Sequence, residues 1–244
     1  LQHCQRWLPN LQTEHITNLL PNLLLLNYET IGRQSGTIIF DNSLYDLLNN
    51  SLGYDVRSFD SYFYDNQPVQ ELRIILNTIR DNIFVDELEI EYNNLWLKNI
   101  DFNSYVSEGA EQRVYLFNES YVLKLNDSIY YESWQDYFTN LLLHNFFFYD
   151  TAYELIGFYE NNQRIYAVVR QSIIRITNKT DLFQVRHFME SNKFEAIRNN
   201  DYYNQELGII IEDLHDENVL TQNGILYFID TVFYLTESFW NTEN

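Results

Sequence analysis

From about residue 100, pairs of strand-forming segments alternate with single helical segments, and this order constrains the fold more than any other feature of the chain. Two adjacent segments rich in β-branched and aromatic residues, 111–118 and 121–126, are separated only by Glu119 and Ser120, which predicts a hairpin. Segments 153–160 and 164–174, joined by a turn at Asn161-Asn162, predict a second hairpin.

Apolar residues recur at helical spacing after each predicted hairpin, in segments 131–148 and 180–197. Thr180 or Asp181 is the expected N-cap of the second helix. The chain then shows an apolar run, a polar loop and two more apolar runs between residues 208 and 233. This order predicts a mixed α+β fold.

The first 95 residues differ in composition, because they hold all three prolines of the chain, Pro9, Pro21 and Pro68. Helical patterns at 13–26 and 68–83 and a strand-like run at 36–40 predict a mixed α/β accessory region of unknown role. We therefore divide the chain into this region, residues 1–95, followed by segments 96–170 and 171–244.

Charge and composition exclude several classes of function. The formal net charge of −20 repels phosphate, so neither nucleic acid nor an anionic membrane is an expected partner. A single cysteine, Cys4, excludes an internal disulfide and a multi-cysteine zinc site. The apolar runs at 19–28 and 141–149 are too short and interrupted to span a bilayer, and no secretory signal opens the sequence, so a reducing, cytoplasmic location is expected.

The segment GIIIEDLHDENVL, residues 208–220, places a cluster of polar residues between two apolar runs. Its polar residues are Asp213, His215, Asp216, Glu217 and Asn218. Loops that follow buried strands often carry functional groups, although a solvated acidic turn would show the same pattern. Asp230, at the end of the apolar run 224–229, could bind a hard cation such as Mg²⁺ or could cap a turn.

Lys124 is the one lysine set within an apolar run, YVLKLN. Such a lysine either extends outward to solvent or meets an anion in a cleft. Gly109, fifteen residues before Lys124, begins a turn into the predicted hairpin, but one glycine is a weak signal for a phosphate-binding loop.

Taken together, these residues fit the requirements of phosphoryl transfer. That reaction needs a lysine for phosphate, carboxylate and amide oxygens for Mg²⁺, and an aspartate for the attacking hydroxyl. Lys124, Asp213, Asn218 and Asp230 occur in the order of those parts in kinases, with four residues between Asp213 and Asn218.

The strings EGAEQRVYLFNESYVLKLND, GIIIEDLHDENVL and ILYFID resemble the kinase domains of polyvalent proteins from phages and conjugative elements. Those domains are part of the protein-kinase-like superfamily, which includes the aminoglycoside phosphotransferases. The resemblance covers roughly residues 100–235. It implies a two-lobed fold with a reduced C-lobe, because only 14 residues follow Asp230.

The resemblance also assigns roles to single residues. Asp213 would be the catalytic aspartate and Lys124 the phosphate-binding lysine, while Asn218 and Asp230 would bind Mg²⁺. Glu132 would pair with Lys124, with Asp136 as its competitor. ATP would be held by Lys124 and by the turn Gly109, Ala110 and Glu111, and His215 would brace its loop through a backbone carbonyl.

Three functions are compatible with these features. The first is an ATP- and Mg²⁺-dependent phosphotransferase acting on a protein, encoded by a phage or mobile element. The second is a pseudokinase that keeps the fold as a protein-binding module, favoured by the single glycine and the short C-terminal part. The third is a small-molecule kinase, since DLHDEN is similar to the catalytic-loop motif of aminoglycoside kinases.

Overall fold

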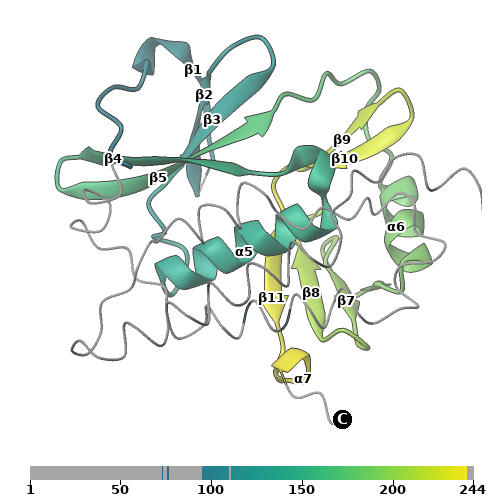
Figure 1. The fold of residues 1–244 in the computed structure, drawn as a ribbon. Coiled ribbons are helices and arrows are strands. Elements are labelled where there is room, and N and C mark those ends of the chain that lie inside the picture. The colour runs from purple at the N-terminus through teal and green to yellow at the C-terminus, as the bar shows by residue number, and fades with distance from the viewer. Residues whose placement is uncertain (1–72, 74–75, 77–94, 110, 241–244) are drawn as a thin grey trace, which may run out of the picture.

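The computed structural model describes Arg73, Leu76, and residues 95–109 and 111–240 (Figure 1). The expected elements at 13–26 and 36–40, most of that at 68–83, and the accessory region as a unit lie outside these residues. Leu76 packs into the main core, and Arg73 donates a hydrogen bond to the Leu207 carbonyl. Within the described part of the chain, no helix is long and apolar enough to cross a membrane.

A five-stranded antiparallel sheet opens the described part, with strand order β1-β2-β3-β5-β4. A short 3-10 helix, η3 (Phe102–Ser104), precedes it. Its strands are β1 (Tyr105–Glu108), β2 (Gln112–Leu116), β3 (Tyr121–Asn126), β4 (Glu154–Asn161) and β5 (Arg164–Ser172). Both predicted hairpins are confirmed, while the edge strand β1 was not expected from the sequence.

Helix α5 (Trp134–Phe147) runs beneath this sheet (Figure 1). Ser133 caps it by accepting a hydrogen bond from the Asp136 amide, so the helix begins three residues later than the pattern predicted. The 3-10 helix η4 (Tyr149–Thr151) then leads into β4. Because β3 lies between β2 and β5, both of its edges are paired, and its second half, Lys124 to Asn126, is buried.

The second part of the chain contains two small sheets and two helices. A four-stranded sheet has the order β11-β8-β7-β6, and β9 and β10 form a separate hairpin. The bounds are α6 (Leu182–Ser191), β6 (Glu195–Ala196), β7 (Tyr202–Asn204), β8 (Ile209–Glu212), β9 (Val219–Gln222), β10 (Ile225–Phe228), β11 (Val232–Leu235) and α7 (Glu237–Trp240).

Two details of this part differ from expectation. Helix α6 is capped by Asp181, as predicted, but it ends at Ser191 because the chain turns into β6. The strands on either side of the polar loop 213–218 belong to different sheets, since β8 pairs with β7 and β11 while β9 pairs with β10. Asn223 and Gly224 both have positive φ, as a two-residue hairpin turn requires.

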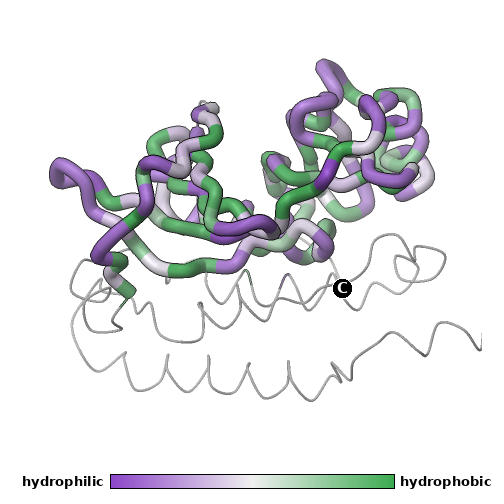
Figure 2. Tube along the Cα trace, turned by 90° about the horizontal axis from the view of Figure 1, so that it is seen from above, coloured by the Kyte–Doolittle hydropathy of each residue, from purple (hydrophilic) through white to green (hydrophobic). Residues whose placement is uncertain are grey.

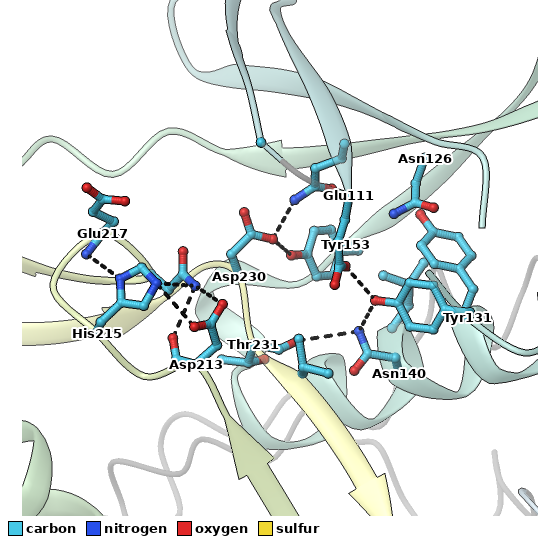
Figure 3. A pocket seen from close by; sticks show the side chains of 16 residues that line it. Glu111, Asn126, Tyr131, Asn140, Tyr153, Asp213, His215, Glu217, Asp230 and Thr231 are labelled. Carbon is cyan, nitrogen blue, oxygen red and sulfur yellow. Dashed lines mark hydrogen bonds and ion pairs between the residues drawn. The ribbon is translucent and has the colours of Figure 1, made fainter. Parts of the chain in front are cut away.

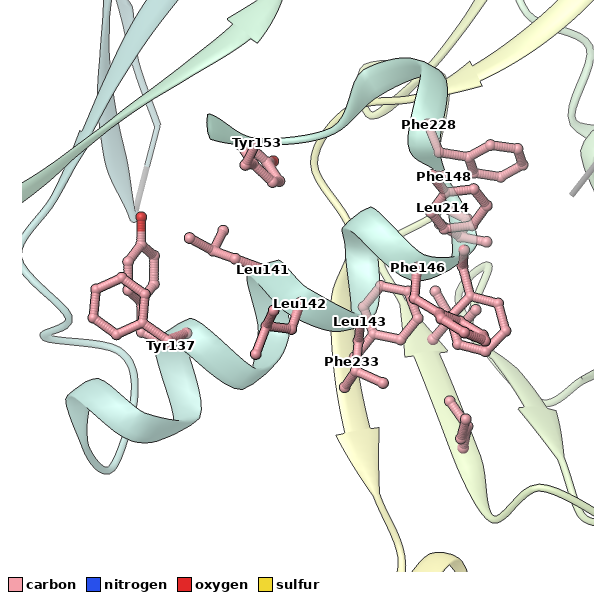
Figure 4. Close-up of a cluster of buried hydrophobic side chains, with 14 of the residues drawn as sticks. Tyr137, Leu141, Leu142, Leu143, Phe146, Phe148, Tyr153, Leu214, Phe228 and Phe233 are labelled. Atoms are coloured by element: carbon pink, nitrogen blue, oxygen red, sulfur yellow. The ribbon is translucent and has the colours of Figure 1, made fainter. Parts of the chain in front are cut away.

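One large hydrophobic core joins α5 to both parts of the fold (Figure 4). Phe158 on β4 and Phe138 on α5 are fully buried beneath the five-stranded sheet. Near the end of α5, the ring of Phe147 stacks on Phe233 of β11, and the ring of Phe148 stacks on Phe228 of β10. Hydrophilic residues concentrate at the turn between β4 and β5, at the left of Figure 2.

Candidate active site

The polar loop after β8 begins with a constrained backbone. Asp213 has φ +71°, a left-handed conformation that Asp and Asn adopt more readily than most residues. Its amide donates to Asp201 Oδ1 at 3.1 Å, and the next amide, of Leu214, donates to the Asn200 carbonyl at 3.2 Å. The backbone is therefore held from behind, and the Asp213 side chain, 56% exposed, is left accessible.

His215 and Asn218 close the loop around Asp213. Asn218 Nδ2 donates to the carboxylate Oδ2 and to the backbone carbonyl of Asp213, both at 3.1 Å. His215 Nε2 lies 3.3 Å from Asp213 Oδ1, and its Nδ1 accepts a hydrogen bond from the Glu217 amide. His215 thus braces the loop, as expected, but through a carboxylate and an amide rather than a carbonyl.

Lys124 lies in the middle of β3 and is only 3% exposed. Its Nζ donates to the Ile229 carbonyl at 3.1 Å, is 3.3 Å from Asp230 Oδ2, and lies over the ring of Tyr153. Burial lowers the pKa of Lys124, because it disfavours the charged amine, and the neighbouring Asp230 carboxylate opposes that shift. The lysine is an inward-facing cation and not an exposed edge-strand residue.

Asp230 follows β10 and contacts both parts of the fold. Its Oδ1 accepts hydrogen bonds from Gln112 Nε2 on β2 and from the Tyr153 hydroxyl at 3.2 Å. The same hydroxyl lies 2.6 Å from the Ile229 carbonyl. The Asp230 carboxylate is therefore fixed by two neutral donors and one cation, while 36% of its side chain remains exposed.

These side chains meet at one cavity of about 270 Å³ between the first sheet, α5 and the loops 213–218 and 230–232 (Figure 3). Its lining residues are Gly109, Glu111, Gln112, Asn126, Tyr131, Tyr137, Asn140, Leu141, Tyr153, Asp213, His215, Glu217, Asn218, Asp230, Thr231 and Val232. Lys124 reaches the cavity wall through its contact with Asp230. Polar side chains from distant segments thus converge on a single hollow.

Glu111 points into this cavity from the turn between β1 and β2 (Figure 3). Its Oε2 accepts a hydrogen bond from the Tyr131 hydroxyl at 3.0 Å. Burial raises the pKa of Glu111, and the charges of Asp230 and Asp213 raise it further, whereas the Tyr131 hydrogen bond lowers it. Gly109 N–H donates to the Gln112 carbonyl, which makes this turn tight.

The structure brings most of the expected site residues together, with one correction. Asp213, Asn218 and Asp230 line the cavity with Gly109 and Glu111, and Lys124 reaches it through its contact with Asp230. Ala110 lies outside the described residues. The expected ion pair between Glu132 and Lys124 is not formed. Glu132 precedes the capping residue Ser133, so it lies before the helix and is exposed. Asp136 is also exposed, and its carboxylate accepts a hydrogen bond from the Ser133 hydroxyl. The carboxylate partner of Lys124 is Asp230.

Sequence reasoning missed several residues that support the site. Gln112 and Tyr153 bind Asp230, and Tyr131 binds Glu111. Asn140 and His144, which hydrogen-bond to Thr231, were missed as well. These two had a signal in the sequence, because they are polar residues within the apolar run NLLLHNFFF and a buried polar side chain must find a hydrogen-bond partner.

The oxygen ligands present suit Mg²⁺ bound together with a phosphate ligand. Among residues 95–109 and 111–240, no group of three His, Cys, Asp or Glu side chains could hold a metal alone. Mg²⁺ is usually bound through one or two protein carboxylates plus substrate phosphates. Asp230 and Asn218 offer one carboxylate and one amide oxygen, and the 3.3 Å approach of Lys124 Nζ shows that Asp230 already faces positive charge.

The site has the layout of a kinase-like site. It combines a buried lysine, an aspartate at the start of a polar loop, an amide five residues later and a second aspartate after the next hairpin. The family model described as "Serine/Threonine/Tyrosine Kinase found in polyvalent proteins" matches residues 84–237, more than half of the chain, which therefore belongs to this family. No curated protein matches the chain. No solved structure matches it either.

Proposed function

We propose that the chain is an ATP- and Mg²⁺-dependent phosphotransferase that acts on a protein hydroxyl. The observation that carries this proposal is the convergence of Asp213 and Asn218 with the Lys124–Asp230 pair on one cavity. The four residues come from segments up to 106 positions apart in sequence order, and all serve the same chemistry in kinases.

Each side chain has a distinct task in this proposal. Lys124 supplies positive charge to the nucleotide phosphates, and Asp230 and Asn218 would hold Mg²⁺. When bound, Mg²⁺ supplies charge that neutralises the phosphate oxygens. The turn that holds Gly109 and Glu111 would cover the phosphates.

Asp213 would act on the acceptor. It orients the attacking hydroxyl and takes its proton as the new oxygen–phosphorus bond forms and the bond from the terminal phosphorus to the bridging oxygen of ATP breaks. ADP then leaves with that bridging oxygen. The exposure of the Asp213 side chain supports this role, because an acceptor must reach it from solvent.

The proposal extends to the architecture. Residues 96–170, which hold α5 and all of the five-stranded sheet except the last two residues of β5, would be the N-lobe. Residues 171–244 would be a reduced C-lobe. Residues 1–95 would form an accessory region outside the nucleotide site. Membership of the polyvalent-protein kinase family supports a protein acceptor and a phage or mobile-element origin, and we propose a cytoplasmic setting without nucleic-acid partners.

A second candidate is a binding module that has lost phosphoryl transfer. It is favoured by the hydrogen bonds of Asp230, since Gln112, Tyr153 and Lys124 already occupy both carboxylate oxygens. If this arrangement persisted with nucleotide present, Lys124 could not serve the phosphates.

Asp230→Asn tests the proposal, with Asp216→Asn as its control. Both substitutions remove one carboxylate near the loop, but Asp216 points outward to Lys179. The wild type and Asp216→Asn should bind ATP with Mg²⁺ and show phosphate transfer from labelled ATP, while Asp230→Asn should lose Mg²⁺-dependent binding. A wild type that binds Mg²⁺-ATP without any transfer, or that binds no nucleotide at all, contradicts the phosphotransferase and supports the binding module.

A further inference from the structure

Helix α5 presents two buried polar side chains to the segment that follows Asp230. Asn140 is 6% exposed and His144 is fully buried, and they lie four residues apart, on the same face of the helix. Both face Thr231 and its neighbours rather than Lys124.

Asn140 holds the start of β11 through both ends of its amide. Its Oδ1 accepts the Phe233 N–H at 2.8 Å, and its Nδ2 lies 3.4 Å from the Thr231 carbonyl (Figure 3). The same Nδ2 lies 3.3 Å from the Tyr131 hydroxyl, which binds Glu111. Asn140 therefore connects the segment that follows Asp230, through the Tyr131 hydroxyl, to Glu111 in the turn between β1 and β2.

His144 holds the Thr231 side chain, and its partners fix its tautomer. Nε2 lies 3.1 Å from the Thr151 carbonyl, which can only accept, so Nε2 carries the proton. Nδ1 is therefore free to accept from the Thr231 hydroxyl, 2.7 Å away. Burial lowers the pKa of His144 to about 3, with the charge of Lys124 as a second cause, which agrees with a neutral ring.

The segment before Asp230 is held just as closely from the other side. The Ile229 carbonyl accepts from Lys124 Nζ and from Gln171 Nε2, both at 3.1 Å. Asp230 thus lies between two anchored neighbours, and the anchors on its C-terminal side come from α5. Residues that orient a metal ligand typically change metal affinity about 10- to 100-fold when they are removed.

We propose that Asn140 and His144 are positioning residues that fix the Asp230 carboxylate for the cation and the nucleotide phosphates. The inference rests on the proposed function of Asp230. Both contacts are made by neutral groups, so they orient the aspartate without competing with the metal for its charge. Helix α5 would thereby support the site by hydrogen bonds to Thr231 and Phe233, the segment that follows Asp230, in place of a glutamate paired with Lys124.

The test compares Thr231→Val with Thr231→Ser in the full chain. Valine has nearly the shape of threonine but cannot donate to His144 Nδ1, whereas serine keeps the hydroxyl. Two quantities are measured: the Mg²⁺ concentration needed for half-maximal ATP binding, and amide hydrogen exchange of residues 229–235 without ligand. Thr231→Val should raise the first about 10- to 100-fold and speed exchange in that segment, and Thr231→Ser should restore both.

Two variants of His144 provide a second comparison should Thr231→Val fold poorly. In His144→Asn, the amide oxygen stands near the place of Nδ1 and can accept from Thr231, whereas His144→Gln keeps only a donor near the place of Nε2. His144→Gln should therefore show the larger rise in Mg²⁺ requirement. The melting temperature of each variant shows whether the substitution destabilises the whole fold or only the segment around Thr231.

The outcomes separate the inference from the function on which it rests. Equal Mg²⁺ requirement in wild type, Thr231→Val and His144→Gln would overturn the positioning role and leave the phosphotransferase proposal standing. A wild type without Mg²⁺-dependent ATP binding would overturn the phosphotransferase proposal and the inference with it.

Discussion

Lys124 and Asp230 form an ion pair across the cavity wall, with Nζ 3.3 Å from Oδ2, although the two residues lie on different sides of the fold. The lysine is almost fully buried, whereas the aspartate keeps a solvent-facing side. Nucleotide phosphates entering the cavity would therefore share the lysine with Asp230, and the incoming cation would replace the lysine's charge on the aspartate.

This pair should show strong coupling in a double-mutant cycle. Lys124→Met leaves the Asp230 carboxylate without its cation and should lower the free energy of unfolding by about 1–3 kcal/mol, less than for a fully buried pair because Asp230 can turn to water. Adding Asp230→Asn should cost less than the sum of the two single changes. Chemical denaturation gives the free energy of unfolding of the wild type, the two single variants and the double variant. Strictly additive changes would show that the two residues are not coupled.

Asp213→Asn should separate binding from transfer. Asparagine tolerates the positive φ at this position, so the loop backbone should keep its conformation, but the amide cannot take a proton. Affinity for Mg²⁺-ATP should stay within about threefold of wild type, while the transfer rate falls about 100- to 10,000-fold. Transfer at an undiminished rate in the presence of a protein acceptor would remove Asp213 from the chemistry.

His144 should make folding sensitive to acid. Its pKa is about 3 in the folded chain against an ordinary 6.5, so between these values the unfolded chain binds more protons and the free energy of unfolding falls as pH falls. The contribution of His144 to this slope is at most about 1.4 kcal/mol per pH unit. Denaturation of wild type and His144→Gln from pH 7 to pH 4 should give a shallower dependence for the variant, and parallel curves would contradict it.

Gly208 and Gly224 form a matched pair for stability. Both have positive φ, +70° and +79°, but a Cβ at Gly208 would lie 2.5 Å from the Phe239 amide nitrogen, whereas one at Gly224 meets nothing within 4 Å. Gly224→Ala should cost about 1–2 kcal/mol from backbone strain alone. Gly208→Ala should cost more, because the turn between β7 and β8 must move away from residues 236–239, and equal melting temperatures for the two variants would contradict the packing seen at α7.

Glu111→Gln should strengthen nucleotide binding. Glu111 adds a third carboxylate near the cavity beside Asp213 and Asp230, and a neutral amide would remove its repulsion of phosphate while still accepting from Tyr131. The dissociation constant for Mg²⁺-ATP should fall about two- to tenfold at low ionic strength, with a smaller change at high salt. Glu119→Gln, at the exposed turn between β2 and β3, provides the control, and a weaker binding of ATP by Glu111→Gln would show that the carboxylate contributes directly.

Several elements could be predicted from the sequence because each has a local signature. The run around Lys124 is apolar and strand-forming, Asn223-Gly224 marks a tight turn, and Asp181 precedes a helical pattern. Strand pairing between distant segments has no such signature. The pairing of β8 with β11, and not with the adjacent β9, follows from the packing of those strands against α5, which short-range patterns do not encode.

The sequence could predict those residues of the candidate site that are marked by their type and their order along the chain. Lys124, Asp213, Asn218 and Asp230 could be singled out because phosphoryl transfer needs those groups in that order. The partner of Lys124 could not, because it depends on where the first turn of α5 begins. The Ser133 cap places Glu132 outside the helix, and only the three-dimensional path of the chain brings Asp230 to the lysine.

Asp230 stands between β10 and β11, which belong to different sheets, and its side chain contacts Gln112 in a third. Any compound that fills the cavity would therefore contact the first sheet, β11 and the link between β10 and β11 at once. Proteases cut chains chiefly when they open, and binding to the folded state alone makes opening rarer. The lifetime of this protein in a cell would then follow the supply of its ligand, so that scarcity would shorten the survival of the protein as well as leave it idle.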